Sequence, residues 1–151
     1  MKFHVLAASF AVAAGLLAST PARSQSLESV QPAYTGLLVA SPNPVNFSLS
    51  HGLSTGRWVT VTNYGQGNAG PLLVDGPTGG GPPAVYRDPG HDYCTNATLG
   101  PGQSCQFNVV FDSSCPQAST IYATFTVSAP NGSAPTLYIS GKGVSKGGSC
   151  E

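Results

Sequence analysis

The feature that most constrains the fold is an alternation of apolar and polar residues with a period of two. Each alternating segment places an apolar side chain at every second position. Such a period sends successive side chains to opposite faces of an extended strand, so each segment has one face to bury and one to expose. No window shows the sustained 3.6-residue spacing of an amphipathic helix, and we therefore predict an all-β fold. The alternating segments are 45–49, 58–62, 105–111, 121–127 and 137–140.

Turn-forming residues separate these segments, and weaker strand patterns complete the set. Gly, Pro and Asn interrupt the alternation, because Gly and Asn accept a positive φ and Pro cannot donate to a ladder. Short strands at this spacing, each with one apolar face, predict a sandwich or a barrel. The longest irregular stretch, Gly76–Pro83, is best interpreted as a connection, with a mobile binding loop as the alternative. Further short strands are predicted within Tyr34–Ala40 (an edge strand), Pro71–Asp75 and Ala84–Arg87.

The first residues have the pattern of a secretory signal peptide. Lys2 precedes a short apolar run, and small residues precede a polar stretch. We predict cleavage after Ser24, with Ala22 as a second candidate, and export to the periplasm or the medium. An uncleaved anchor is the alternative, but the run is shorter than the roughly 20 residues that a bilayer requires. The predicted organisation is a signal peptide over 1–24, an N-terminal segment with the edge strand over 25–44, and the β domain with its tail over 45–151.

Charge is sparse, and this excludes several classes of function. Only 8% of residues are charged and the formal net charge is zero. Without a basic patch the chain has no means of neutralising phosphates, so neither nucleic acid nor an anionic membrane surface is a predicted partner. The glycine run at 79–81 lacks the following Lys-Ser/Thr of a phosphate loop. No cofactor is predicted.

Several short motifs, taken in order, form a pattern that is known from other proteins. They are Phe47, Val59–Gly65 (VTVTNYG), Leu99–Cys105 (LGPGQSC), Val109–Phe111 and Leu137–Gly143. Together they resemble the immunoglobulin-like domains of the ASH/Hydin group, including the bacterial "choice-of-anchor" modules of exported proteins. The resemblance covers 45–143 and implies an antiparallel sandwich of about seven strands with a structural or binding role and no catalytic residues. The chain departs from the group after Phe111. Members of the group more often have a proline soon after this phenylalanine, whereas here Asp-Ser-Ser-Cys-Pro occupies 112–116.

Four cysteines fall after the predicted signal peptide, and in an exported protein an even number indicates disulfides. In the sandwich, Cys94 and Cys105 flank the Gly-Pro-Gly turn and are predicted to pair. Cys115 precedes one strand and Cys150 follows its expected antiparallel neighbour, so these two are predicted to form the second bridge. No CxxC motif supports a redox role.

The sequence contains fragments of three catalytic or metal-binding patterns, and none of them is favoured. A zinc site at His91, Asp92 and Cys94 lacks the usual paired ligand spacing. The segment Gly52–Gly56 fits Gly-x-Ser-x-Gly beside His51, but a strand rather than a helix is predicted to follow, so a turn is favoured. A glycosidase pair would need a cleft between two carboxylates, and the sequence indicates none. The available acids are Asp75, Asp88, Asp92 and Asp112, of which Asp88 and Asp92 are best interpreted as turn residues.

Alternation places Trp58, Tyr122 and Tyr138 on polar sheet faces. Exposed aromatic side chains could bind a protein or a glycan by stacking. The favoured interpretation is that Gln25–Ala40 or the glycine-rich stretch covers them, yet they remain the best candidate for a binding surface. The predicted function is a non-enzymatic structural or binding module with an unknown protein or glycan ligand. The alternatives are a subunit of an envelope assembly that pairs through an edge strand, and a small hydrolase or metal-dependent enzyme.

Overall fold

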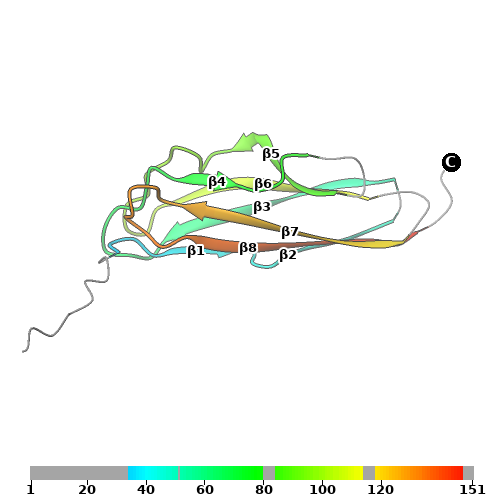
Figure 1. Cartoon of the computed structure of the whole chain (residues 1–151), viewed down its shortest axis with the longest axis horizontal. Coiled ribbons are helices and arrows are strands. Elements are labelled where there is room, and N and C mark those ends of the chain that lie inside the picture. The colour runs from blue at the N-terminus through cyan, green and yellow to red at the C-terminus, as the bar shows by residue number, and fades with distance from the viewer. Residues whose placement is uncertain (1–33, 51, 80–83, 114–117, 148–151) are drawn as a thin grey trace, which may run out of the picture. The chain divides into compact units, whose positions relative to one another are not determined.

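Two β-sheets face each other in the part of the chain that the structure describes (Figure 1). This structure is a computed structural model, and it describes residues 34–50, 52–79, 84–113 and 118–147. The described residues form strands, turns and loops, and none of them is helical, which confirms the predicted all-β class. The strands are β1 (Leu38–Ser41), β2 (Val45–Leu49), β3 (Ser54–Asn63), β4 (Leu73–Asp75), β5 (Ala84–Asp92), β6 (Ser104–Asp112), β7 (Ser119–Ser128) and β8 (Leu137–Ser145).

The first sheet has the strand order β1-β3-β6-β5, and the second has the order β2-β8-β7-β4. This division of strands is that of an immunoglobulin-like sandwich. Eight strands occur rather than about seven, because the chain between Ser41 and Pro44 passes from one sheet to the other and so divides the first strand into β1 and β2. The same crossing makes β2 parallel to β8, whereas every other strand pairing in the described chain is antiparallel.

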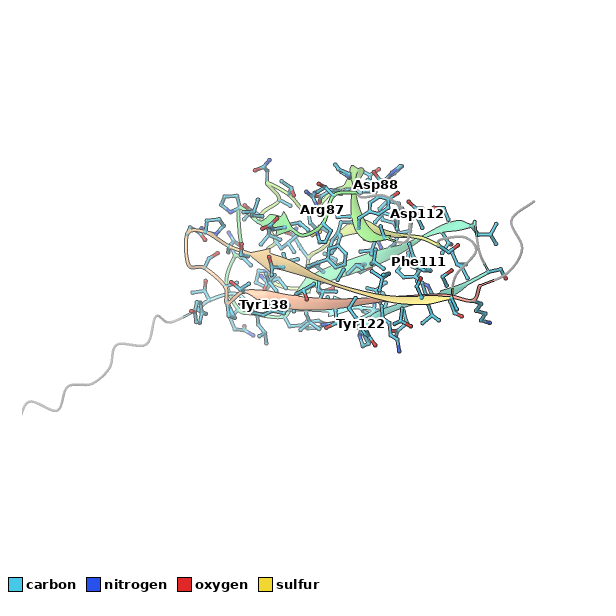
Figure 2. All side chains as sticks on the ribbon, turned by 45° about the vertical axis from the view of Figure 1, so that its right-hand side comes forward. Arg87, Asp88, Phe111, Asp112, Tyr122 and Tyr138 are labelled. Atoms are coloured by element: carbon cyan, nitrogen blue, oxygen red, sulfur yellow. A yellow bond between two sulfur atoms is a disulfide. The ribbon has the colours of Figure 1, made fainter. Side chains whose placement is uncertain are left out.

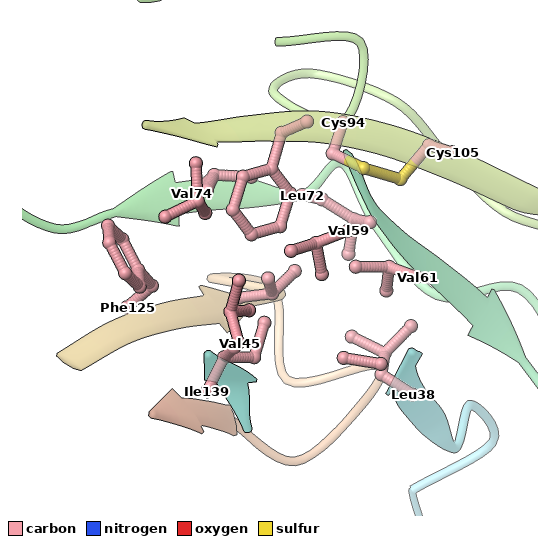
Figure 3. Packing of buried hydrophobic residues seen from close by; sticks show 14 of the residues in the cluster. Leu38, Val45, Val59, Val61, Leu72, Val74, Cys94, Cys105, Phe125 and Ile139 are labelled. Atoms are coloured by element: carbon pink, nitrogen blue, oxygen red, sulfur yellow. A yellow bond between two sulfur atoms is a disulfide. The ribbon is translucent and has the colours of Figure 1, made fainter. Parts of the chain in front are cut away.

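The apolar positions of the alternating segments fill the space between the two sheets (Figure 3). In β3, for example, Val59 and Val61 are fully buried, while Thr60 between them faces outward. Phenylalanine rings join the sheets: Phe47 of β2 lies 5.8 Å from Phe111 of β6 between ring centroids, and Phe107 of β6 lies 6.4 Å from Phe125 of β7. Burial of this cluster is the main stabilising contribution to the fold. Its largest fully buried apolar members are Phe107, Phe111, Phe125, Leu72, Ile139, Val45, Val59, Val61, Val109 and Val127.

Two glycines of β8 face this core, and both are required there by close packing. A Cβ at Gly143 would lie 2.3 Å from the ring of Phe111. A Cβ at Gly141 would lie 3.0 Å from both Phe125 and Val85. The Gly-Lys-Gly motif of this strand therefore makes room for phenylalanine rings of the core.

Asn63, at the end of β3, is fully buried and has all of its amide hydrogen bonds satisfied. Its Oδ1 accepts from the backbone N–H groups of Leu37 at 3.0 Å and Gly65 at 2.9 Å. Its Nδ2 donates to the carbonyl oxygens of Gly67 and Leu99, each at 2.8 Å. One side chain thus joins the approach to β1, the loop after β3 and the loop before β6. The asparagine of the Val-Thr-Asn-Tyr-Gly motif therefore holds three segments of the chain together.

The disulfide between Cys94 and Cys105 confirms the first predicted bridge. It ties the loop after β5 to the start of β6 beside the core cluster (Figure 3). The second predicted bridge, Cys115–Cys150, lies outside the described residues, as does the predicted signal peptide over 1–24. In the described part of the chain, no helix has the length and apolar character needed to cross a bilayer.

Candidate binding surface

Trp58 lies on the outer face of the first sheet and is 42% exposed. Its ring is stacked with that of Tyr93, at 5.8 Å between centroids and 18° between planes. The imidazole of His91 meets the indole edge-on, at 5.8 Å and 81°. Tyr93 is 64% exposed. Three aromatic side chains from β3, β5 and the loop after β5 therefore form one exposed cluster, which we call the Trp58 surface.

An irregularity in β5 brings His91 to this surface. The register between β5 and β6 shifts between Asp88 and Asp92, so that Pro89, Gly90 and His91 bulge out of the strand. Asp88 closes the bulge: its Oδ1 accepts from the N–H of Gly90 at 2.9 Å, and its Oδ2 lies 2.6 Å from Nδ1 of His91. These hydrogen bonds, with the one to His91 the larger influence, lower the pKa of Asp88. The carboxylate therefore stays charged and fixes the imidazole beside Trp58.

Asp92 holds the backbone around Tyr93. Its Oδ1 accepts from the N–H groups of Cys94 at 2.9 Å and Thr95 at 3.0 Å. Its Oδ2 accepts from the hydroxyl of Thr95 and from Arg87, each at 2.5 Å. Burial alone would raise the pKa of Asp92 and is the largest single influence, but the Thr95 and Cys94 hydrogen bonds and the charge of Arg87 together lower it. With the disulfide next in the chain, this network makes a rigid base for Tyr93.

Uncharged polar side chains extend the Trp58 surface along β3 and β6. Nε2 of Gln106 donates to Oγ1 of Thr60 at 2.9 Å. The hydroxyl oxygens of Thr62 and Ser104 lie 2.8 Å apart. These pairs continue the outer face of the first sheet next to Trp58, because Thr60 and Gln106 oppose each other in the β3–β6 register, as do Thr62 and Ser104.

Tyr122 and Tyr138 lie on the outer face of the second sheet, so the structure does not bring them together with Trp58. Tyr122 of β7 is 72% exposed, and Nζ of Lys142 lies 5.8 Å from its ring centroid. Tyr138 of β8 is 67% exposed. Figure 2 shows both tyrosines on the side of the molecule opposite Asp88. The sequence pattern predicts that all three aromatic residues face outward, which holds, but it does not tell which sheet carries each one.

The side chains considered for catalysis or metal binding have structural partners. Cys94 forms the disulfide and both oxygens of Asp92 accept hydrogen bonds, so two of the three residues of the disfavoured zinc interpretation already have structural partners. The turn interpretation of Gly52–Gly56 is wrong for its last three residues, because strand β3 already begins at Ser54. The predicted strand in place of a helix is confirmed; His51 lies outside the described residues. Asp88 and Asp92, interpreted from the sequence as turn residues, both lie in strand β5, where Asp88 bonds to Gly90 within the bulge.

The other acids and the glycine-rich stretch are likewise partly accounted for. Asp75 accepts from the N–H of Gly76 at 2.8 Å. Asp112 approaches Tyr86, and burial together with this carboxylate raises the pKa of the Tyr86 phenol. Within Gly76–Pro83, the carbonyl of Pro77 accepts from the N–H of Arg87 at 2.6 Å, as expected for a connection that runs against β5; residues 80–83 lie outside the described residues.

Sequence reasoning missed His91 and Tyr93 as neighbours of Trp58. The signal that could have found them is Asp88-Pro89-Gly90, a turn sequence within a strand, which indicates a bulge. A bulge moves the following residues out of the ladder and redirects their side chains. Sequence alone does not give the direction of that displacement.

Comparison with known proteins supports the fold. No protein-family model matches this chain, and no curated protein matches it. Among solved structures, it is similar to the ASH/PapD-like domain of human CEP192 (PapD-like domain 7), with a TM-score of 0.52, 11% identity, and coverage of 88% of this chain and 100% of that domain. At this identity the likeness shows the fold alone, an immunoglobulin-like sandwich.

Two bacterial proteins are similar over a smaller part of their length. One is the secreted serine protease VesC from Vibrio cholerae, with a TM-score of 0.49, 15% identity, and coverage of 72% of this chain. The other is the VesB protease of Vibrio cholerae, with a TM-score of 0.46, 17% identity, and coverage of 72%. This chain spans 23% of the VesC chain and 31% of the VesB chain.

Proposed function

We propose that this protein is an extracytoplasmic, non-enzymatic immunoglobulin-like module that binds its ligand through the Trp58 surface. The observation that carries this proposal is the exposed stack of Trp58 on Tyr93, held between the His91 bulge and the disulfide-tied loop. Rigid aromatic side chains that stay exposed are a common feature of interaction sites, because they offer a large apolar area at a small cost in side-chain entropy.

Two observations support a location outside the cytoplasm. The first is the signal-peptide pattern of residues 1–24. The second is the Cys94–Cys105 disulfide, since such bonds persist mainly in oxidising compartments. The resemblance to choice-of-anchor modules, which belong to exported proteins, points the same way.

The absence of catalysis is proposed because the reactive side chains have structural tasks. Asp92 and Cys94 build the loop after β5, and Ser54 begins a strand. Binding through a sheet face is favoured over edge-strand pairing because the edges are short or irregular. Of the four edge strands, β4 has three residues, β1 has four and β2 has five, while Pro89 and the bulge interrupt β5. Such edges discourage the addition of another chain's strand.

The test is capture by the immobilised, oxidised protein from envelope extract and culture medium of the source organism. Trp58→Ala should lose the captured ligand, and Tyr122→Ala, which removes an exposed aromatic side chain from the other sheet, should retain it. Equal unfolding midpoints of the two variants would show that both are folded. A ligand captured equally by all three proteins would contradict a role for the Trp58 surface, and a substrate turned over by the purified chain would contradict a non-enzymatic role.

A further inference from the structure

We propose that the ligand of the Trp58 surface is a neutral glycan. This inference rests on the binding role proposed above and names the chemical class of the ligand. Three properties of the surface support it: the aromatic stack, the polar side chains beside the stack, and the distribution of charge.

The aromatic stack suits one face of a sugar ring. A pyranose presents C–H groups on its faces and hydroxyl groups around its rim, so that a face can pack on an exposed aromatic ring while the rim remains hydrogen-bonded. Trp58 and Tyr93 are close to parallel, at 18°, and both are substantially exposed. The edge-on contact from His91, itself fixed by Asp88, restricts rotation of the indole. The platform is therefore preorganised, which reduces the entropy lost on binding.

The polar side chains beside the stack suit sugar hydroxyl groups, each of which is both a donor and an acceptor. Thr60, Thr62 and Ser104 carry hydroxyls, and Gln106 carries an amide, whose oxygen is an acceptor. The bonds from Gln106 to Thr60 and between Thr62 and Ser104 use only part of this capacity. A chain of sugar units that crosses β3 and β6 from Trp58 would meet these groups in succession.

The distribution of charge disfavours an anionic ligand. Arg57 and Arg87 oppose Val109 in the register of the first sheet and so belong to its inward row. The guanidinium of Arg57, although exposed, lies 5.8 Å from the ring centroid of Phe47 in the second sheet, and that of Arg87 is paired with Asp92. Val109 is fully buried. Lys142 lies on β8 of the second sheet. On the outer face of the first sheet, the charged groups of the described residues are thus two carboxylates: Asp88, which is paired with His91, and Asp112, which lies further along β6 and interacts with Tyr86.

A glycan is also favoured over a protein partner. A specific protein interface buries about 800 Å² on each side around a cluster of apolar side chains. Around the Trp58–Tyr93 pair, the neighbouring side chains Thr60, Gln106 and Asn108 are polar and uncharged. This combination of one aromatic platform with many small hydrogen-bonding groups matches a polyhydroxylated ligand better than an apolar protein surface.

Trp58 is the single tryptophan of the chain, so tryptophan emission, excited selectively over that of tyrosine, reports on this surface. We would titrate the oxidised protein with cellohexaose, xylohexaose, mannohexaose and N-acetylated chitohexaose, and run native gels that contain the corresponding polysaccharides. At least one sugar should give a saturable change in tryptophan emission and retarded migration. Trp58→Ala should abolish the retardation, and Tyr93→Ala should weaken it about tenfold, which corresponds to about 1.4 kcal/mol. Tyr122→Ala should bind like the wild type.

The inference is overturned if none of the four sugars changes the emission or the migration, or if Trp58→Ala binds as well as the wild type. Its failure is distinguishable from that of the proposed function. If the capture experiment yields a Trp58-dependent ligand that protease treatment destroys, the ligand class is wrong while the binding role stands. If nothing depends on Trp58 in either experiment, both are wrong.

Discussion

Replacement of the buried Asn63 gives a quantitative test of how the loops are held to the sandwich. Asn63→Ala removes four hydrogen bonds, those to Leu37, Gly65, Gly67 and Leu99. A buried hydrogen bond contributes about 1 kcal/mol net, so the expected loss in the free energy of unfolding is about 4 kcal/mol. That is a large fraction of the roughly 5–15 kcal/mol typical of a domain. Guanidinium unfolding, followed by Trp58 fluorescence, measures it.

Asn63→Asp separates the hydrogen bonds from the size of the side chain. The carboxylate keeps the acceptor role toward Leu37 and Gly65 but turns an oxygen toward the carbonyls of Gly67 and Leu99. Burial and these two oxygens disfavour the charged form, so the pKa of the new carboxyl should be higher in the folded protein than in the unfolded one. The stability deficit of the variant should therefore be greatest near pH 7 and should shrink as the pH falls toward 4.5.

The matched control is Asn46, an exposed residue of β2. Asn46→Ala and Asn46→Asp should change the free energy of unfolding by less than about 0.5 kcal/mol. The reasoning is refuted if Asn63→Ala lies within 1 kcal/mol (about one lost hydrogen bond) of the wild type. A deficit of Asn63→Asp that does not depend on pH would refute it as well.

Three further predictions address the core, the disulfide and the Asp92 network. Gly143→Ala should lower the free energy of unfolding by about 2 kcal/mol or more, because the added Cβ would overlap the Phe111 ring. Ser140→Ala, on the exposed side of the same strand, is the control and should be near neutral. Denaturant unfolding of the two variants measures the difference. Replacement of Cys94 and Cys105 together by serine should cost about 3 kcal/mol, the loop-closure value for a separation of 11 residues. The loss should shrink when both proteins are compared as reduced chains, to the cost of placing serine hydroxyls at two buried positions. The pKa of Asp92 is lower in the folded protein than the ordinary value of 3.8 for this side chain, so the stability that its carboxylate contributes is present above that value and is lost as the pH falls through the lower folded pKa. Asp92→Asn should therefore be less stable than the wild type at pH 7 and approach it as the pH falls below that ordinary value; a thermal unfolding series at stepped pH checks this, and a gap that widens in acid would contradict it.

The strands could be predicted because their signal is local. Val59 and Val61 alternate with Thr60 and Thr62, and this pattern reports burial on one face whatever the partner strand is. The Cys94–Cys105 bridge could also be predicted, since only a turn separates the two residues. The parallel pairing of β2 with β8 could not, because the alternation in 45–49 says nothing of the neighbour that a strand acquires after the crossing at Pro42 and Pro44.

The Trp58 surface could be predicted only in part. Alternation shows that Trp58 faces outward, but the same signal gives Tyr122 and Tyr138 the same property on the other sheet. The neighbours of Trp58 depend on the register shift between Asp88 and Asp92, a non-local outcome of pairing with β6. Asn63 was visible as part of a motif, but its fourfold bonding depends on loops that meet only in the folded chain.

The proposed function requires that the protein is exported and that the Cys94–Cys105 disulfide fixes the loop that carries Tyr93. We would express the full chain in a bacterium, recover it from periplasm and medium, and map its termini and cysteine linkages by mass spectrometry after non-reducing chymotrypsin digestion, which cuts at Leu99 between the two cysteines. The expected result is a chain that begins at Gln25 and a linked peptide pair that joins Cys94 to Cys105. A chain that stays in the cytoplasm with Met1 in place, or a Cys94 that is free or joined to a different cysteine, would contradict it.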